Sequence, residues 1–94
     1  MTETVTDRSE GERFELAVDG AVAFVDYRRS GDVLVLTHAE VPAHLEGRGV
    51  GSRLVGAVLD LVRSRGERVI PRCPFIAHYV ERHPEYRDLL ADRR

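Results

Sequence analysis

The sequence predicts an α+β fold in which a mixed β-sheet carries helices. Two changes of period along the chain support this prediction. Apolar residues alternate with polar ones between Phe14 and Val41, which is the pattern of half-buried strands. After Pro42 the apolar residues recur every three or four positions, which is the pattern of an amphipathic helix. A short strand and further helical segments follow, so the expected order of elements is β-β-β-α-β-α.

Three strands joined by tight turns form the predicted antiparallel meander, over residues 14–18, 21–28 and 33–41. Asp19-Gly20 is typical of a two-residue hairpin turn, because both central positions of such a turn need a positive φ. Residues 1–13 are polar, charged and aperiodic, so we predict that they form a flexible tail. Residues 14–94 are then one domain.

The long amphipathic helix is predicted to begin at Val50 and to end before Gly66, which suits the left-handed residue that follows a helix. Residues 68–72 read as a short strand. A strand-helix-strand unit nearly always makes a right-handed crossover, so this strand should run parallel to the third strand of the meander.

Two prolines mark the remaining helical segments, because proline suits the first turn of a helix. Pro74 begins a helix through about Arg82, and Pro84 begins a last short one through Leu90. The apolar residues of the first of these segments are expected to pack against the sheet: Phe75, Ile76 and Val80.

The composition excludes several classes of protein. The chain has 94 residues and a net charge of −2 at pH 7, so a nucleic-acid-binding surface is not expected. Every basic residue is arginine, which excludes a Walker-type phosphate loop because that loop needs a lysine; this usage is also typical of GC-rich bacterial genes. A single cysteine and the lack of a long apolar run predict a cytoplasmic protein without a membrane partner.

A glycine-rich loop joins the third predicted strand to the long helix. Its sequence is Glu46-Gly47-Arg48-Gly49-Val50-Gly51. Such a loop lets the backbone approach a ligand closely and leaves the first N–H groups of the helix free to bind an anion. The dinucleotide fingerprint GxGxxG does not match, because Ser52 and Leu54 stand where a third glycine is required. A glycine-rich turn without a ligand is the alternative.

With its flanking strand and helix, this loop resembles the pyrophosphate loop of the GNAT superfamily of N-acetyltransferases, which reads Q/R-x-x-G-x-G/A. Gly49 and Gly51 match both required glycines, whereas Glu46 departs from the usual Gln or Arg. Three further motifs are similar to those of the minimal, YjdJ-type GNAT subfamily: HxEVP at 38–42, CPF at 73–75 and HPEY at 83–86.

The resemblance implies acetyl-CoA as the cofactor, with coenzyme A as the product. The implied cofactor-binding residues are Glu46, Gly47, Arg48, Gly49, Val50, Gly51, Ser52 and Arg53. Backbone N–H groups would hold the pyrophosphate, and Arg48 and Arg53 would either add contacts to phosphate or remain surface charges. GNAT enzymes hold the pantetheine between two parallel strands that separate, here the strands of His38 and Val69, so His38 and Cys73 are expected to face one cleft.

Three residues are candidates for the reacting centre. Cys73 precedes Pro74 at a helix N-terminus, where the dipole favours the thiolate. The resemblance places it near the acetyl group of the cofactor. There it would either accept the acetyl group covalently or protonate the leaving sulfur of coenzyme A. The alternative is a small buried residue. His38 is a candidate general base, or a histidine hydrogen-bonded at a strand end. Glu40 is the second candidate base, since many GNAT enzymes place a glutamate nearby.

These features favour an acetyltransferase that moves acetyl from acetyl-CoA to a primary amine on a protein or a small molecule. A regulatory module that binds CoA or acyl-CoA without turnover is the alternative. The remaining histidines lack ligand spacing, so no metal site is expected. The resemblance also implies that the N-terminal strand and paired helices of larger GNAT enzymes are missing, which leaves the acceptor side open or closed by another subunit. We expect a monomer or a weak homodimer.

Overall fold

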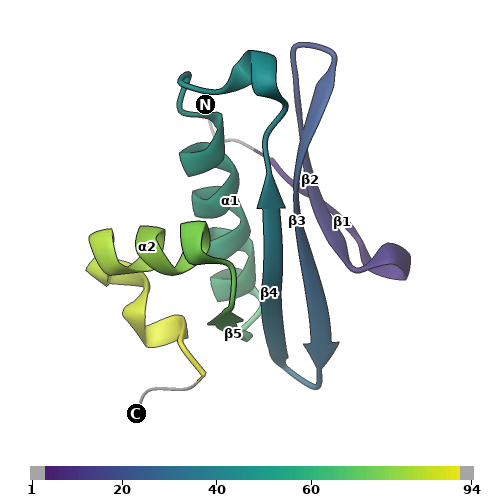
Figure 1. Ribbon diagram of the computed structural model, residues 1–94. Coiled ribbons are helices and arrows are strands. Elements are labelled where there is room, and N and C mark those ends of the chain that lie inside the picture. The colour runs from purple at the N-terminus through teal and green to yellow at the C-terminus, as the bar shows by residue number, and fades with distance from the viewer. Residues whose placement is uncertain (1–3, 92–94) are drawn as a thin grey trace.

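A five-stranded mixed sheet, in the order β1-β2-β3-β4-β5, forms the centre of the molecule (Figure 1). The computed structural model describes residues 4–91. The strands are β1 (Thr6–Arg8), β2 (Arg13–Val18), β3 (Ala21–Ser30), β4 (Val33–Glu40) and β5 (Arg68–Pro71). Neighbouring strands are antiparallel from β1 to β4, and β5 is parallel to β4. The predicted meander and the parallel strand after the long helix are therefore confirmed.

Two α-helices and three short 3-10 helices complete the chain. They are η1 (Ser9–Gly11), η2 (Ala43–Leu45), α1 (Val50–Ser64), α2 (Pro74–Arg82) and η3 (Pro84–Leu89). Gly66 follows α1 with a φ of 72°, and its N–H donates to the Arg63 carbonyl, as expected of a left-handed residue at a helix end. Within the described residues, no helix has the length and apolar character that crossing a bilayer requires.

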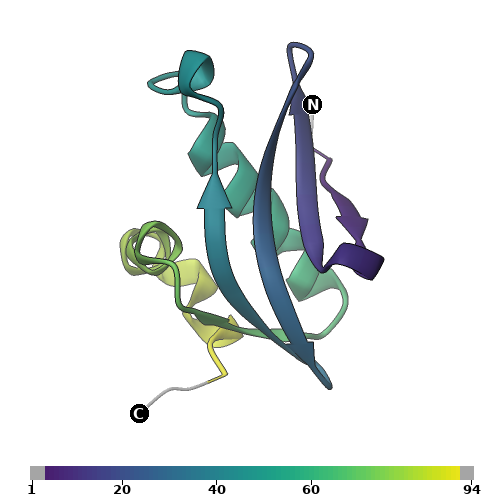
Figure 2. The same ribbon diagram turned by 45° about the vertical axis from the view of Figure 1, so that its right-hand side comes forward.

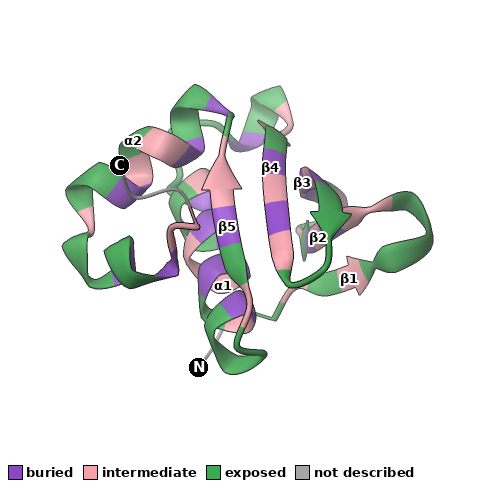
Figure 3. Cartoon of the chain, turned by 90° about the horizontal axis from the view of Figure 1, so that it is seen from below, coloured by how far each residue is buried: buried purple, intermediate pink, exposed green. Residues whose placement is uncertain are grey.

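The core lies between one face of the sheet and α1, which runs behind β2, β3 and β4 in Figure 2. Burial alternates along the strands (Figure 3), so every second side chain of the sheet reaches this core. The sheet contributes Phe14, Leu16, Ala23, Val25, Tyr27, Leu34, Leu36 and Val69, and α1 contributes Val50, Leu54, Val55, Val58, Leu59 and Val62. The predicted apolar stripe of α1 is the stripe that is buried.

The predicted flexible tail is wrong for residues 6–13. This segment contains β1 and η1, and β2 begins at Arg13; residues 1–3 lie outside the described residues. Asp7 holds β1 in place, because its carboxylate accepts hydrogen bonds from the Tyr27 hydroxyl (2.6 Å) and from Arg65 (2.8 Å). The chain therefore has an N-terminal strand after all. A three-residue charged strand has no periodicity, so the sequence pattern could not reveal it.

A β-bulge interrupts the pairing of β3 with β4. Tyr27 pairs with Leu36 and Asp26 pairs with His38, so Thr37 is the extra residue. Its hydroxyl donates to the Asp26 carbonyl (3.3 Å). Beyond this bulge the alternation of side chains along β4 is shifted by one residue, which changes the face on which the end of the strand presents each side chain.

Polar contacts join the outer side of α1 to η3. The Tyr86 hydroxyl donates to Asp60 (2.7 Å). Arg63 donates to the Glu85 carbonyl (2.7 Å) and to the Asp88 carboxylate (2.6 Å). These contacts fasten the last helical segment of the described chain to the helix that covers the core.

The Tyr86–Asp60 hydrogen bond predicts a dependence of stability on alkaline pH. Burial, and next the hydrogen bond to Asp60, raise the pKa of Tyr86, so the folded chain keeps a proton that an unfolded tyrosine loses near pH 10. The free energy of unfolding therefore falls as the pH rises above about 10. We expect Tyr86→Phe to lower the free energy of unfolding by about 1 kcal/mol at neutral pH and to make the alkaline fall shallower, in urea unfolding followed by circular dichroism. Equal alkaline slopes would contradict this assignment.

Candidate functional site

The glycine loop forms a turn that ends on the N-terminus of α1. Gly47 and Gly49 have φ angles of 81° and 76°, in the left-handed region that only glycine adopts without strain. Gly49 is the N-cap of α1, no side chain caps the helix and its first turn holds no acidic residue. The first bond of the helix runs from the Arg53 N–H to the Gly49 carbonyl (3.1 Å). The earlier N–H groups, through Ser52, are therefore available to an anion.

An open cleft of about 440 Å³ begins at this loop and extends to the end of β4. Its lining joins the loop backbone to an apolar wall made by Ala39, Val41, Leu45, Leu54 and Phe75. Six of the eight residues predicted to bind the cofactor line it: Glu46, Gly47, Gly49, Val50, Gly51 and Ser52. An anion-binding helix N-terminus beside an apolar wall fits a ligand with a phosphate group and an extended, less polar arm.

The two arginines of the loop do not line this cleft. Arg48 forms an ion pair with Asp19 (3.1 Å), at the turn between β2 and β3. Arg53 lies with Ser52 and Tyr79 in a second cleft of about 350 Å³ on the outer side of α1. Of the two alternatives left open for these arginines, the surface ion pair is the one observed for Arg48.

Phe75 forms one wall of the cleft, contrary to the expectation that it packs against the sheet. Its side chain is 48% exposed, whereas Ile76 and Val80 are buried as predicted. A Cβ atom at Gly51 would lie 2.9 Å from the ring of Phe75. Glycine at position 51 therefore allows this close approach of the Phe75 ring, and a larger residue there would displace the ring. The CPF tripeptide was the only signal for Phe75, because its position lies off the buried stripe of α2.

The sheet opens where β5 ends. The parallel ladder stops at the pair Leu36–Pro71, whereas β4 continues to Glu40. The Leu36 carbonyl accepts both the Arg72 N–H (2.9 Å) and the Cys73 N–H (3.1 Å), and the chain then turns into α2. Cys73 is the N-cap of α2 and is only 7% exposed. It is thus buried at the fork between the two strands.

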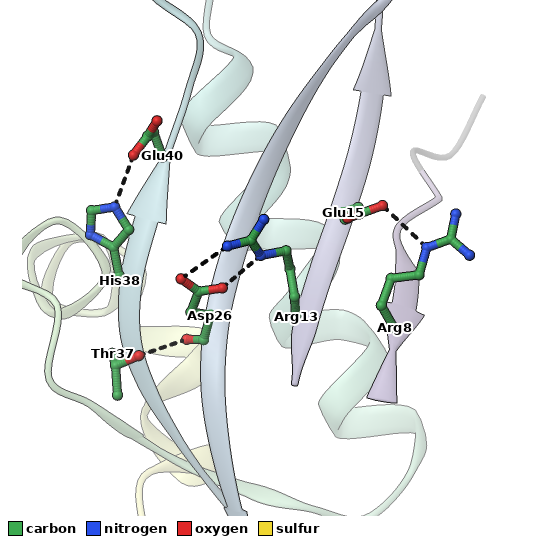
Figure 4. A network of polar contacts seen from close by, with 7 residues as sticks. All are labelled: Arg8, Arg13, Glu15, Asp26, Thr37, His38 and Glu40. Carbon is green, nitrogen blue, oxygen red and sulfur yellow. Dashed lines mark hydrogen bonds and ion pairs between the residues drawn. The ribbon is translucent and has the colours of Figure 1, made fainter. Parts of the chain in front are cut away.

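His38 and Glu40 form a pair on the face of the sheet that α1 does not cover (Figure 4). The His38 Nε2 lies 3.1 Å from a Glu40 carboxylate oxygen, and the two side chains are 54% and 60% exposed. The bulge at Thr37 determines this placement, because the shifted alternation directs Ala39 to the cleft and leaves His38 and Glu40 on the opposite face. Glu40 is therefore placed to orient the imidazole and to accept its proton.

A network that the sequence did not predict supports this pair. Arg13 donates to both carboxylate oxygens of Asp26 (2.7 and 3.5 Å), and its guanidinium lies over the ring of Phe24 at 3.7 Å. The Phe24 ring contacts His38, with 6.0 Å between ring centroids. Alternation places all these side chains on one face, but only the register between strands brings them together.

The structure therefore divides the predicted catalytic residues between two places. His38 and Glu40 are in contact on the helix-free face, whereas Cys73 lies at the fork, and none of the three lines the cleft at the glycine loop. In the part of the chain that the structure describes, no cluster of three or more histidine, cysteine or acidic residues is arranged to hold a metal ion.

Comparison with known proteins identifies the family of the chain. Residues 13–89 match the family described as GCN5-related N-acetyl-transferase. The solution NMR structure of a GCN5-like protein from Staphylococcus aureus, provisionally named an N-acetyltransferase, is similar with a TM-score of 0.72 and 25% identity, covering 99% of this chain and 92% of that chain. No curated protein matches the sequence. Since the family match spans nearly the whole sheet and both α-helices, the chain belongs to the GCN5-related (GNAT) N-acetyltransferases and is an acetyltransferase.

Proposed function

We propose that this enzyme uses acetyl-CoA as its donor and transfers the acetyl group to a primary amine. The observation that carries the proposal is the uncapped N-terminus of α1, which opens with two left-handed glycines into a cleft beside the fork of the sheet. Helix N–H groups and dipole suit a pyrophosphate. The apolar wall suits the pantetheine arm. This arm would leave the cleft beside the part of β4 that extends beyond the end of β5.

Acetyl-CoA would supply the activated acetyl thioester. The chain would bind it and would provide the groups that accept and donate protons. The N–H groups from Gly49 to Ser52 bind the pyrophosphate, and Phe75 excludes water from one side of the cleft. Glu46 adds a carboxylate near the pyrophosphate. Binding of the pyrophosphate therefore depends on the backbone N–H groups and not on a Gln or Arg side chain at this position.

His38 acts as the general base, and Glu40 positions it. The acceptor approaches from the helix-free face as an ammonium ion and transfers one proton to the neutral imidazole, which leaves an electron pair on nitrogen for attack on the acetyl carbonyl. The Glu40 carboxylate stabilises the resulting imidazolium. Cys73, at the fork, has one of two roles. It either accepts the acetyl group first, with its thiol proton leaving on the CoA sulfur, or gives that proton to the departing sulfur and regains one from the acceptor nitrogen as the amide forms.

Binding of the donor is tested by calorimetry with acetyl-CoA and with CoA. We expect saturable binding of both, and a loss of at least about tenfold in affinity in Gly49→Glu, because the substitution strains a left-handed residue and places a carboxylate at the phosphate site. Gly11→Glu is the matched control, since Gly11 has open space around it and no positive φ. Absence of binding to the unaltered protein at millimolar ligand would remove the donor proposal, and binding without turnover on any amine would favour a regulatory CoA-binding module.

The roles of the pair are tested on turnover. We expect His38→Ala and Glu40→Gln to lower kcat by about 100-fold or more and about tenfold, respectively, while the Kd for acetyl-CoA stays within about twofold. His44→Ala is the control, because His44 is an exposed histidine in η2 that does not line the cleft. A rise in KM alone in His38→Ala would show that His38 binds the acceptor and does not act as a base.

Cys73 is tested by replacement and by mass spectrometry. We expect Cys73→Ala to lower kcat without weakening acetyl-CoA binding, since the residue is buried at the fork and not in the phosphate cleft. Incubation with acetyl-CoA alone separates the two roles: a covalent step adds one acetyl group to Cys73, whereas a proton donor leaves the mass unchanged. Full turnover by Cys73→Ala would reduce Cys73 to a packing residue.

A further inference from the structure

The helix-free face of the sheet carries its charges in two distinct zones. Strand register defines them, because side chains of directly paired residues share a face. The upper zone holds Arg8, Arg13, Glu15, Phe24, Asp26, His38 and Glu40. The lower zone holds Arg28, Val33, Val35, Arg68 and Ile70, since Arg28 and Ile70 both pair with Val35, and Arg68 pairs with Val33. Among residues 4–91, no helix crosses this face (Figure 2).

The two zones differ in how their charges are balanced. In the upper zone, Arg8 pairs with Glu15 and Arg13 pairs with Asp26. Among residues 4–91, Glu40 forms an ion pair only with His38, so in this range the zone presents one carboxylate that no arginine neutralises by direct contact.

The lower zone has the opposite character. Arg28 and Arg68 are exposed, and neither forms an ion pair with any residue between 4 and 91. Half-buried valine and isoleucine side chains lie between them. This zone therefore offers two guanidinium groups across an apolar strip, which complements carboxylates on a partner.

The shape of this face favours a polymer over a small metabolite. Sites for small molecules are concave and bury most of the ligand. The His38 and Glu40 side chains are more than half exposed, and the sheet around them is an open surface (Figures 2 and 4). An acceptor held here must gain its affinity by spreading contacts over several residues, as an extended polypeptide does on a sheet.

We propose that the acceptor is an acidic polypeptide that lies along β4 on the helix-free face. Its amine reaches His38 and Glu40, and carboxylates a few residues away contact Arg28 and Arg68. The placement of the amine at His38 and Glu40 rests on the proposed acetyl transfer. The docking of the acidic segment on Arg28 and Arg68 does not depend on it.

The geometry predicts where the acidic residues stand in the acceptor. On β3 the partners of His38, Val35 and Val33 are Asp26, Arg28 and Ser30, and strand residues rise by about 3.3 Å each. Because the bulge at Thr37 adds no residue to β3, Val35 lies about 7 Å along the sheet from His38, and Val33, opposite Arg68, about 13 Å away. An extended acceptor has the same rise. Acidic side chains are therefore expected at about the second to the fourth positions after the residue that bears the amine, which are the third to the fifth residues of a peptide whose N-terminal residue bears it.

Three fluorescent octapeptides test this inference. Each has a free N-terminal amine, a dye at the C-terminus and a neutral background of alanine and serine, with aspartate, serine or arginine at the third to fifth positions. We expect the aspartate peptide to bind the unaltered protein about fivefold to tenfold more tightly than the serine peptide in fluorescence anisotropy, as expected of two exposed ion pairs. The preference should fade as salt is added.

Charge reversal supplies the matched comparison. Arg28→Glu combined with Arg68→Glu should reverse the order, so that the arginine peptide binds best, whereas Arg87→Glu, the same substitution at one exposed position on η3, should leave the order intact. Thermal unfolding of all variants establishes that they are folded. In turnover assays the aspartate peptide should show a lower KM with a similar kcat.

Equal affinity for the aspartate and serine peptides would overturn the inference, and so would an order that the double reversal leaves unchanged. An oligothymidylate that binds more tightly than the aspartate peptide, and that loses its affinity in the double reversal, would replace the acidic polypeptide with a nucleic acid. Acetyl-CoA calorimetry keeps the two proposals apart. Intact donor binding without peptide preference removes only this inference, and peptide preference without donor binding removes only the acetyl-transfer proposal.

Discussion

The arrangement of the site depends on the backbone carbonyl of Leu36. It accepts N–H groups from both Arg72 and Cys73, so it is the last point at which β4 and the chain beyond β5 are joined. Pro71 ends β5 and Pro74 begins α2, and neither has an N–H group with which to extend the ladder. The parallel strand is therefore short, and β4 runs on without it. This early ending creates the fork that holds Cys73 and the open edge against which the cleft forms.

The bulge at Thr37 determines which side chains each face of β4 presents beyond Leu36. Without the extra residue, regular alternation after Leu36 would direct His38 toward the helices and Ala39 away from them. With it, Ala39 and Val41 line the cleft while His38 and Glu40 stand on the other face. One inserted residue thus separates the apolar wall from the titratable pair. On the proposed function, donor and acceptor would approach the same strand from opposite sides of the sheet.

Much of this architecture could be predicted from the sequence, because strongly periodic segments carry their own signal. The meander, α1 and the glycine loop all follow from alternation, from a helical stripe and from residues that tolerate a positive φ. What escaped prediction depends on contacts between distant segments. The strand β1 is held by Asp7 through Tyr27 and Arg65, the side of Glu40 depends on a bulge, and the ring of Phe75 lies against α1 where Gly51 has no side chain. None of these has a local pattern.

On the proposed function, the charges of the helix-free face could change, and with them the choice of acceptor, without loss of the fold. The core lies entirely on the other side of the sheet, where exchanging a side chain costs several kcal/mol. Exposed arginines such as Arg28 and Arg68 contribute little to the free energy of unfolding, because surface charges are well solvated. The lower zone can therefore change its charge almost independently of stability, whereas the register that positions His38 cannot change without disturbing the cleft behind it. On the proposed function, selectivity for the acceptor would be separable from the geometry of transfer, because Arg28 and Arg68 lie on β3 and β5 whereas His38 and Glu40 lie on β4.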